Sequence, residues 1–334
     1  MRGERDSNMY DVVTLGEAMI RLSPPNNRRL EQATSLDLFI GGAELSVAVG
    51  VSRLGLTSAW VTKLPKGPLG RLIANKAREL GASTDHIVWT DEGRAGLYFL
   101  EFGASPRASS VIYDRKYSAA SMMNPGEIDW SFLKGVKLFH TTGITPALSP
   151  SAREATLEAI DAAKKAGCKI SLDVNYRAKL WSTKEAEATL TPMAEKSDIL
   201  ITTDEDTWRV WNMKGTPEEI ITNLKDKFHI PVVAITIREV ISVLRNRWSS
   251  MVIADKVYKS KRVYEVEIVD RLGAGDSFAS GFIYGYLLGD VQMGVDYGDV
   301  MAAYKHSSPG DCNYMAKDEI DQLVKASSDL RVQR

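Results

Sequence analysis

A short glycine-rich turn that ends in an aspartate is the segment of this sequence best suited to chemistry. It reads Gly273-Ala274-Gly275-Asp276, and the apolar run that follows predicts a helix over Ser277–Leu288. Two glycines around an alanine let backbone N–H groups turn towards one point, where the helix N-terminus adds partial positive charge. This turn predicts an anion hole that would stabilise the charge developing on a transferred phosphoryl group.

Asp276 is the candidate general base beside this anion hole. An aspartate that is ionised at neutral pH can accept the proton of an attacking hydroxyl in the transition state. Asp276 could equally be an ordinary helix cap after a glycine turn, because aspartate is favoured at that position. The turn alone leaves both interpretations open.

Strand and helix patterns alternate through most of the chain and must position this turn. Alternation of nearly continuous apolar strands with amphipathic helices predicts an α/β fold, with a mostly parallel sheet covered by helices on both faces. Ligands of such sheets bind beyond the carboxyl ends of the strands. The predicted strands are Asp11–Gly16, Ala59–Lys63, Leu138–Thr142, Lys169–Val174, Ile199–Thr202 and Val232–Thr236. The predicted helices are Glu44–Leu54, Leu69–Leu80, Pro150–Ala166, Lys184–Glu195 and Pro217–Phe228.

Two segments break this alternation. Arg21–Ile40 and Gly96–Tyr113 contain aromatic and β-branched residues but no covering helix. Strands that leave a parallel core in this way predict a small β lid, with its strands within about residues 21–40 and 96–118. No repeat or linker is visible, so residues 1–334 are expected to form a single domain.

Composition and charge restrict the class of protein. Lys plus Arg (42) nearly cancels Asp plus Glu (43), which gives no reason to expect a nucleic-acid or membrane partner. The chain has two cysteines, Cys168 and Cys312, and therefore no disulfide framework. Its first ten residues are too polar for a signal peptide, and no run approaches the roughly 18 apolar residues of a membrane span. We expect a soluble, cytoplasmic protein.

A second glycine turn, Gly41-Gly42-Ala43-Glu44, opens the first long helix. Together with Gly273–Asp276 it resembles the two signatures of the ribokinase-like carbohydrate kinases, the pfkB family. The resemblance covers residues 10–325 in the correct order and is greatest to the 2-keto-3-deoxygluconate kinases. The other matching stretches are Gly16-Glu17, Gly96-Leu97-Tyr98, Tyr113-Asp114-Arg115, His140–Ser149, Asp173–Arg177 and Pro309-Gly310-Asp311.

The resemblance implies a ribokinase-like fold, ATP and Mg²⁺ as cofactors, and a role for each matched position. Asp276 is the implied base, with Gly273, Ala274 and Gly275 as the anion hole and Arg177 as a further catalytic residue. No direct metal motif is present, and Asp206 is the candidate for a water-mediated magnesium contact. The implied substrate-binding residues are Gly42, Tyr98, Tyr113, Arg115, Arg177, Asp276 and Asp311, and the implied nucleotide-binding residues are Asn175, Thr236, Arg238, Gly273, Ala274 and Gly275.

Several of these residues also have ordinary structural explanations. Tyr98 and Tyr113 could be lid packing, Arg115 and Arg177 could be solvated ion-pair partners, and Asp311 could be a loop turn residue. The chain also departs from the family pattern. The segment Thr236–Ile241 lacks the glycines of the usual nucleotide loop, so Thr236 and Arg238 are expected to replace them.

The resulting prediction is ATP-dependent phosphorylation of 2-dehydro-3-deoxygluconate to its 6-phosphate, by an enzyme expected to be a homo-oligomer. Arg115 on the lid could bind the carboxylate of such a substrate. The alternatives are a kinase for fructose or an aldonate, and a sugar-binding regulator without catalysis. A nicotinamide dehydrogenase shares the sheet type, but its glycine fingerprint is missing after the first strand.

Overall fold

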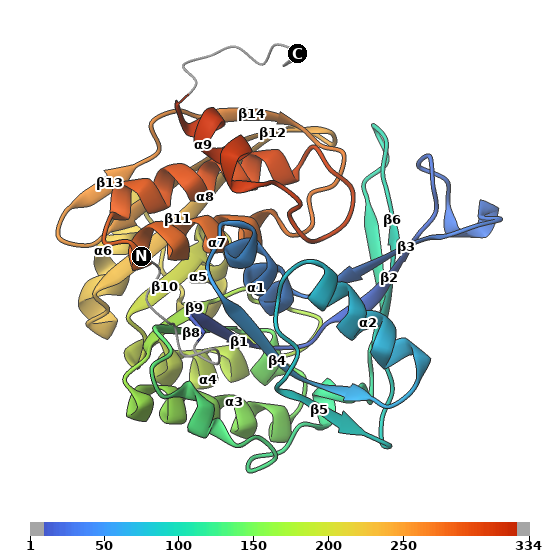
Figure 1. Cartoon of the computed structure of the whole chain (residues 1–334). Coiled ribbons are helices and arrows are strands. Elements are labelled where there is room, and N and C mark those ends of the chain that lie inside the picture. The colour runs from blue at the N-terminus through green and yellow to red at the C-terminus, as the bar shows by residue number, and fades with distance from the viewer. Residues whose placement is uncertain (1–9, 326–334) are drawn as a thin grey trace.

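Short apolar runs form the central sheet of the computed structural model, which describes residues 10–325 (Figure 1). The sheet has ten strands, and its order is β13-β12-β11-β10-β9-β8-β1-β4-β5, with β14 paired to β12. The bounds are β1 (Val12–Leu15), β4 (Ser58–Pro65), β5 (Ile87–Thr90), β8 (Leu138–Thr142), β9 (Lys169–Asp173), β10 (Ile199–Thr203), β11 (Val232–Ser242), β12 (Arg245–Ile253), β13 (Val257–Lys259) and β14 (Tyr264–Glu267).

The strands from β11 to β5 run parallel, whereas β12, β13 and β14 are antiparallel to their neighbours. The mostly parallel sheet predicted from the sequence is therefore confirmed. All six predicted strands are present, because each apolar run is buried on both faces of the sheet.

Helices cover both faces of this sheet, as predicted. One face packs against α1 (Ala43–Arg53), α2 (Pro68–Glu79), α7 (Ala274–Leu287) and α8 (Val291–Lys305). The other face packs against α3 (Pro150–Ala166), α4 (Thr183–Glu195), α5 (Asp204–Trp211) and α6 (Pro217–Phe228). The remaining helices are α9 (Lys317–Lys325) and the 3-10 turns Leu30–Gln32, Ala120–Met122, Trp130–Leu133 and Thr145–Ala147.

A second sheet stands to one side of the first and forms the lid (Figure 1). Its order is β3-β2-β6-β7, with bounds β2 (Met19–Ser23), β3 (Asp37–Gly41), β6 (Leu97–Glu101) and β7 (Ser110–Asp114). Strands β2 and β6 are parallel and join the two hairpins into one sheet. The two segments that break the strand–helix alternation in the sequence thus contribute the strands of this second sheet.

The segment that stands where the family has its nucleotide loop is part of a β-strand. Strand β11 does not stop at Thr236 but continues to Ser242 and pairs with β12 through Val240. A regular antiparallel ladder takes up alternate backbone N–H groups of such a segment. Residues 236–242 therefore form one strand of a hairpin instead of a phosphate cradle.

Within residues 10–325, no helix is long and apolar enough to cross a membrane. Most of the polar N-terminal segment noted in the sequence, residues 1–9, lies outside the described residues.

Candidate active site

The carboxyl ends of the parallel strands bring distant parts of the chain together beneath the lid. Asp173 ends β9 and leads into the loop that carries Arg177, and Thr203 ends β10 and caps α5 through its side chain. The turn Gly273–Asp276 opens α7, which packs against the same sheet. The structure thus brings together the base, anion-hole and Arg177 positions that the sequence analysis singled out.

The geometry of the anion-hole turn depends on Gly273. This residue is the N-cap of α7 with φ +80°, a left-handed conformation that favours glycine. A Cβ at Gly273 would overlap the carbonyl oxygen of Asp311, so the turn is packed against the loop after α8. The first N–H groups of α7 have no acceptor within the helix and can bind an anion.

Asp276 is the third residue of α7, and its surroundings shift its pKa. Burial raises the pKa of Asp276 to about 7, with Glu44 and Asp311 adding to the rise and Arg177 and Lys305 opposing it. Among the described residues, no hydrogen bond or ion pair engages the Asp276 carboxylate, which leaves it available to a ligand. A carboxylate with a pKa near the working pH suits a general base.

Arg177 interacts electrostatically with three carboxylates at this edge of the sheet, those of Asp173, Asp206 and Asp276. Burial raises the pKa of Asp206 to about 6 and that of Asp173 well above its ordinary value, and Arg177 lowers both, as it does for Asp276. Within residues 10–325, no three carboxylate, histidine or cysteine side chains form a ready metal cluster. Asp206 therefore remains the candidate for a water-mediated magnesium contact.

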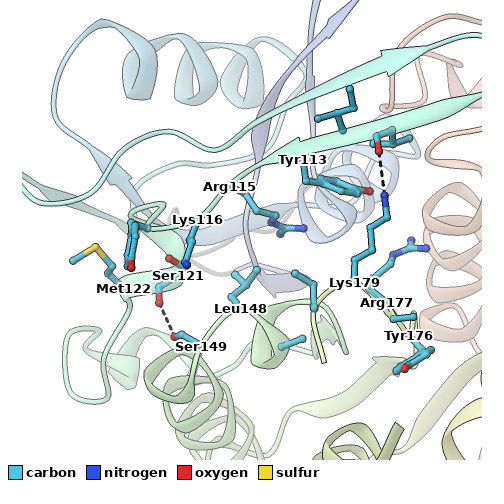
Figure 2. Close-up of a pocket in the computed structure, with 16 residues that line it drawn as sticks. Tyr113, Arg115, Lys116, Ser121, Met122, Leu148, Ser149, Tyr176, Arg177 and Lys179 are labelled. Atoms are coloured by element: carbon cyan, nitrogen blue, oxygen red, sulfur yellow. Dashed lines mark hydrogen bonds between the residues drawn. The ribbon is translucent and has the colours of Figure 1, made fainter. Parts of the chain in front are cut away.

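A cavity of about 930 Å³ opens between the lid and the core beside these residues. Figure 2 shows Tyr113 and Arg115 reaching into it from the lid, and Arg177 and Lys179 from the loop after β9. Lys179 donates a hydrogen bond across the cavity to the Val111 carbonyl (3.2 Å) and so ties that loop to β7. The cavity is lined by Val111, Ile112, Tyr113, Arg115, Lys116, Tyr117, Ser121, Met122, Ala147, Leu148, Ser149, Tyr176, Arg177, Ala178, Lys179 and Leu180.

Arg115 is not a free cation in this cavity. Its guanidinium forms an ion pair with Glu17, whose side chain is 2% exposed and which lies two residues after the end of β1. One oxygen of Glu17 and the Nε of Arg115 are buried without a hydrogen-bond partner. Both groups therefore retain hydrogen-bonding capacity that a ligand could use. Sequence analysis assigned no role to Glu17, although a charged residue after a buried strand was the signal for it.

The two lid tyrosines occupy different environments. They are cross-strand neighbours with ring centroids 5.8 Å apart. Tyr113 is 41% exposed and lines the cavity, whereas Tyr98 is 3% exposed and donates its hydroxyl to Asp311. Asp311 also pairs with Arg21 at 2.7 Å. Tyr98 and Asp311 are thus engaged with each other, and their contact with a sugar stays a prediction.

Gly42 is required by protein packing. A Cβ at this position would overlap the backbone of Glu17 and Ala18. The family resemblance implies a sugar contact at Gly42, and that contact stays a prediction. The neighbouring Gly41 faces Asp311 and Tyr98 in the same way.

The residues expected to bind nucleotide lie along β11 and the end of β9. Thr236 is buried and Arg238 is exposed on the hairpin, while Asn175 has φ +39° and donates to Asp173 (3.4 Å). Sequence analysis missed Arg271, which neighbours the anion-hole turn. Burial and the positive charge of Arg238 lower the pKa of Arg271, whose guanidinium donates to the Val243 carbonyl (2.8 Å). Arg271 is therefore a further cation that could contact nucleotide phosphate.

Glu44 is a further buried carboxylate that the sequence analysis quoted without a role. Its side chain accepts hydrogen bonds from the hydroxyls of Thr142 and Thr145, both at 2.7 Å. Burial raises the pKa of Glu44, and these hydrogen bonds oppose the rise. These hydrogen bonds hold the start of α1 against the end of β8. The negative charge of Glu44 also raises the pKa of Asp276.

Comparison with known proteins gives consistent results. The profile of the pfkB family carbohydrate kinases matches residues 9–317. The crystal structure of a 2-dehydro-3-deoxygluconokinase from Thermotoga maritima is 40% identical, covers 94% of this chain and 98% of its own, and has a TM-score of 0.91. A 2-dehydro-3-deoxygalactonokinase from Haloferax volcanii is 36% identical over 94% of this chain and 96% of its own length. A 5-dehydro-2-deoxygluconokinase from Bacillus subtilis is 30% identical over 97% and 98%.

Proposed function

The chain belongs to the pfkB family of carbohydrate kinases, and we propose that it transfers a phosphoryl group from ATP to the terminal hydroxyl of a keto-deoxy sugar acid. The three relatives described above are named for 2-dehydro-3-deoxy- or 5-dehydro-2-deoxy-hexonates, all of which are carboxylates. The proposed substrate is 2-dehydro-3-deoxygluconate or its galactonate epimer, and the product is the 6-phosphate. The relative named for gluconate has the higher identity and favours the first epimer.

The chain's own residues supply the parts that phosphoryl transfer needs. Asp276 accepts the proton of the attacking hydroxyl, and the N–H groups at the start of α7 stabilise the charge on the transferred group. Arg177, exposed beside three carboxylates, adds a positive charge at this edge of the sheet. The lid covers the sugar and limits the access of water, which would compete as acceptor.

The donor set of this edge fits magnesium. Mg²⁺ usually keeps several waters and takes only one or two protein carboxylates together with substrate phosphates. Asp206, partly exposed at the start of α5, offers one such carboxylate, with the buried Asp173 nearby. When bound, the metal would neutralise phosphate charge. Thr236, Arg238 and Arg271 would hold the nucleotide on the other side of the anion-hole turn.

The observation that carries this proposal is a free carboxylate, Asp276, beside a helix N-terminus and near a cation-lined cavity. A coupled assay of ADP release tests it across 2-dehydro-3-deoxygluconate, 2-dehydro-3-deoxygalactonate, fructose and ribose. We expect kcat/KM to be highest for one of the two acids. A higher kcat/KM for fructose or ribose would contradict the substrate assignment, and release of no ADP with any of them would contradict the kinase function.

Substitution of Arg115 tests how the substrate carboxylate is recognised. Arg115→Ala should raise the KM for the acidic sugar by about 10-fold or more, because it removes a charge-assisted hydrogen bond and leaves the buried Glu17 unpaired. The KM for a neutral analogue such as fructose should change by less than about 3-fold. Equal effects on both substrates would show that Arg115 serves only the structure of the lid.

The ion pair also provides the matched control for this experiment. The double variant Arg115→Ala, Glu17→Gln removes both charges and retains the shape of Glu17. Its KM for the acidic sugar should lie between those of the wild type and Arg115→Ala, because the repulsion from Glu17 is gone while the lost contact is not restored.

The pH dependence of the reaction should report the carboxylate of Asp276. Because the pKa of this group is raised to about 7, it is largely protonated below that pH and cannot accept the hydroxyl proton. We expect log kcat/KM to fall with a slope of about one below pH 7, since kcat/KM reports groups of the free enzyme. Burial is the main cause of the raised pKa, and the negative charge of Asp311 adds to it, so Asp311→Asn should move the midpoint to lower pH. A midpoint below about pH 5 in the wild type would contradict the assignment.

A further inference from the structure

One buried arginine connects the lid to the loop that carries the anion hole. Arg21 lies in the middle of β2, and its side chain is completely buried. Its guanidinium lies 2.6 Å from Asp270 and 2.7 Å from Asp311, while its Nε donates to Ser23 at 3.0 Å. These two carboxylates precede the anion-hole turn and follow α8, respectively. Neither contact is visible from the sequence, because 249 and 290 positions separate the partners.

The lid holds Arg21 from both sides. The guanidinium lies 5.0 Å from the ring centre of Phe39 on β3 and 5.2 Å from that of Phe102, just after β6. Buried Lys305 also faces the same two carboxylates. Two cations thus oppose two carboxylates in a closed polar cluster, in which Arg21 is the member that belongs to the lid.

Each carboxylate of this cluster organises part of the active site. Asp270 accepts the backbone N–H of Leu272 at 3.1 Å and that of Gly310 at 2.9 Å, and so fixes both loops that meet at Gly273. Asp311 accepts the hydroxyl of Tyr98, the lid tyrosine that packs at Gly41. A planar guanidinium can contact two carboxylates at once, which the ammonium of a lysine does poorly.

We propose that Arg21 is a positioning residue that couples the position of the lid to the geometry of the anion-hole turn, through Asp270 and Asp311. The inference rests on the proposed kinase function and extends it to a residue that touches neither reactant. When the lid strand β2 is in place, its guanidinium holds the loops 270–273 and 309–311 together. When the lid strand is displaced, the pair of loops loses its common counter-ion and the N–H groups at the start of α7 lose their alignment.

Arg21→Lys keeps the charge but should not bridge both carboxylates, and it is the first test. We expect kcat to fall by at least about 10-fold, while the KM for ATP changes by less than about 3-fold, because the loss concerns transition-state alignment. Arg107→Met is the matched control, since it removes a lid ion pair with Glu101 that contacts neither loop. A folded Arg21→Lys variant with a kcat within 2-fold of the wild type, or an equal loss in Arg107→Met, would overturn the proposal.

Hydrogen exchange tests the same coupling without any assay of activity. The amides of Leu272 and Gly310 should exchange at least about 10-fold faster in Arg21→Lys and at the wild-type rate in Arg107→Met. Unchanged exchange in Arg21→Lys would overturn the coupling even if the protein proved not to be a kinase, and an inactive wild type with the expected exchange would contradict only the proposed function. Should Arg21→Lys fail to fold, exchange of the wild type in urea gives the test. The hydrogen-exchange rates of the amides in β2, of Leu272 and of Gly310 should then rise with urea concentration with the same slope. Different slopes for β2 and for the two loop amides would refute the coupling.

Discussion

Replacing Asp276 with asparagine is expected to lower kcat by at least about 100-fold and to leave the fold intact, because general-base catalysis typically contributes about 10²–10⁴. Asparagine has nearly the same shape but cannot take the hydroxyl proton. The fold should survive because the carboxylate has no hydrogen-bond or ion-pair partner among the described residues. Burial also disfavours its charged form, as the pKa of about 7 indicates.

Single-turnover kinetics with saturating ATP and sugar acid, together with thermal unfolding, provide the measurement. Asp204→Asn is the control, because Asp204 is an exposed carboxylate at the first position of α5. We expect that control to retain wild-type turnover. Near-normal turnover of a folded Asp276→Asn variant would remove Asp276 from the base role and would return it to the alternative of a simple helix-start residue.

Gly273→Ala should have the second large effect, a loss of about 10²-fold or more in kcat with a lowered melting temperature. Alanine is disfavoured at φ +80°, and its Cβ would overlap the carbonyl oxygen of Asp311. The two loops must separate to relieve this overlap, and the N–H groups at the start of α7 move with them. Removal of a single oxyanion-hole donor costs about 10²–10³ in kcat.

Gly289→Ala is the matched control for the backbone effect. Gly289 has φ +82°, and a Cβ there would meet nothing within 4 Å. We expect a similar loss of stability from the disfavoured conformation, about 1–2 kcal/mol, without a loss of turnover. If Gly273→Ala remained folded with a wild-type kcat, the turn would not be the anion hole.

Local segments of the sequence were sufficient to identify the candidate reactive groups of this chain, without any tertiary information. The Gly273–Asp276 turn predicts an anion hole and a base, because backbone conformation and a helix start are set by a few neighbouring residues. The same holds for the predicted starts of α3 and α6, where the side chains of Ser149 and Thr216 cap helices whose first residue is a proline. Buried strands can also be predicted from the sequence, since both of their faces must be apolar.

The hairpin β11–β12 marks the limit of such local interpretation. The segment Thr236–Ile241 lacks glycines, and the sequence analysis treated it as a modified loop. In the structure it is a strand because β12 supplies the pairing partner, with Thr236 opposite Ser250 and Val240 opposite Asn246. Strand formation at that point depends on a partner segment, which no propensity of the six residues themselves reveals.

The partners of the charged side chains in and around the pocket are determined by the tertiary structure alone. The sequence determined that Arg115, Tyr98 and Asp311 are present, and it offered each as a sugar ligand. Folding paired Arg115 with Glu17, 98 positions away, and placed Asp311 between Tyr98 and Arg21. A buried charge must find an opposite charge or hydrogen bonds when it leaves water. The order of residues along the chain does not specify that partner. The partner is fixed only when the protein folds and the lid strands pack beside the ends of the parallel strands.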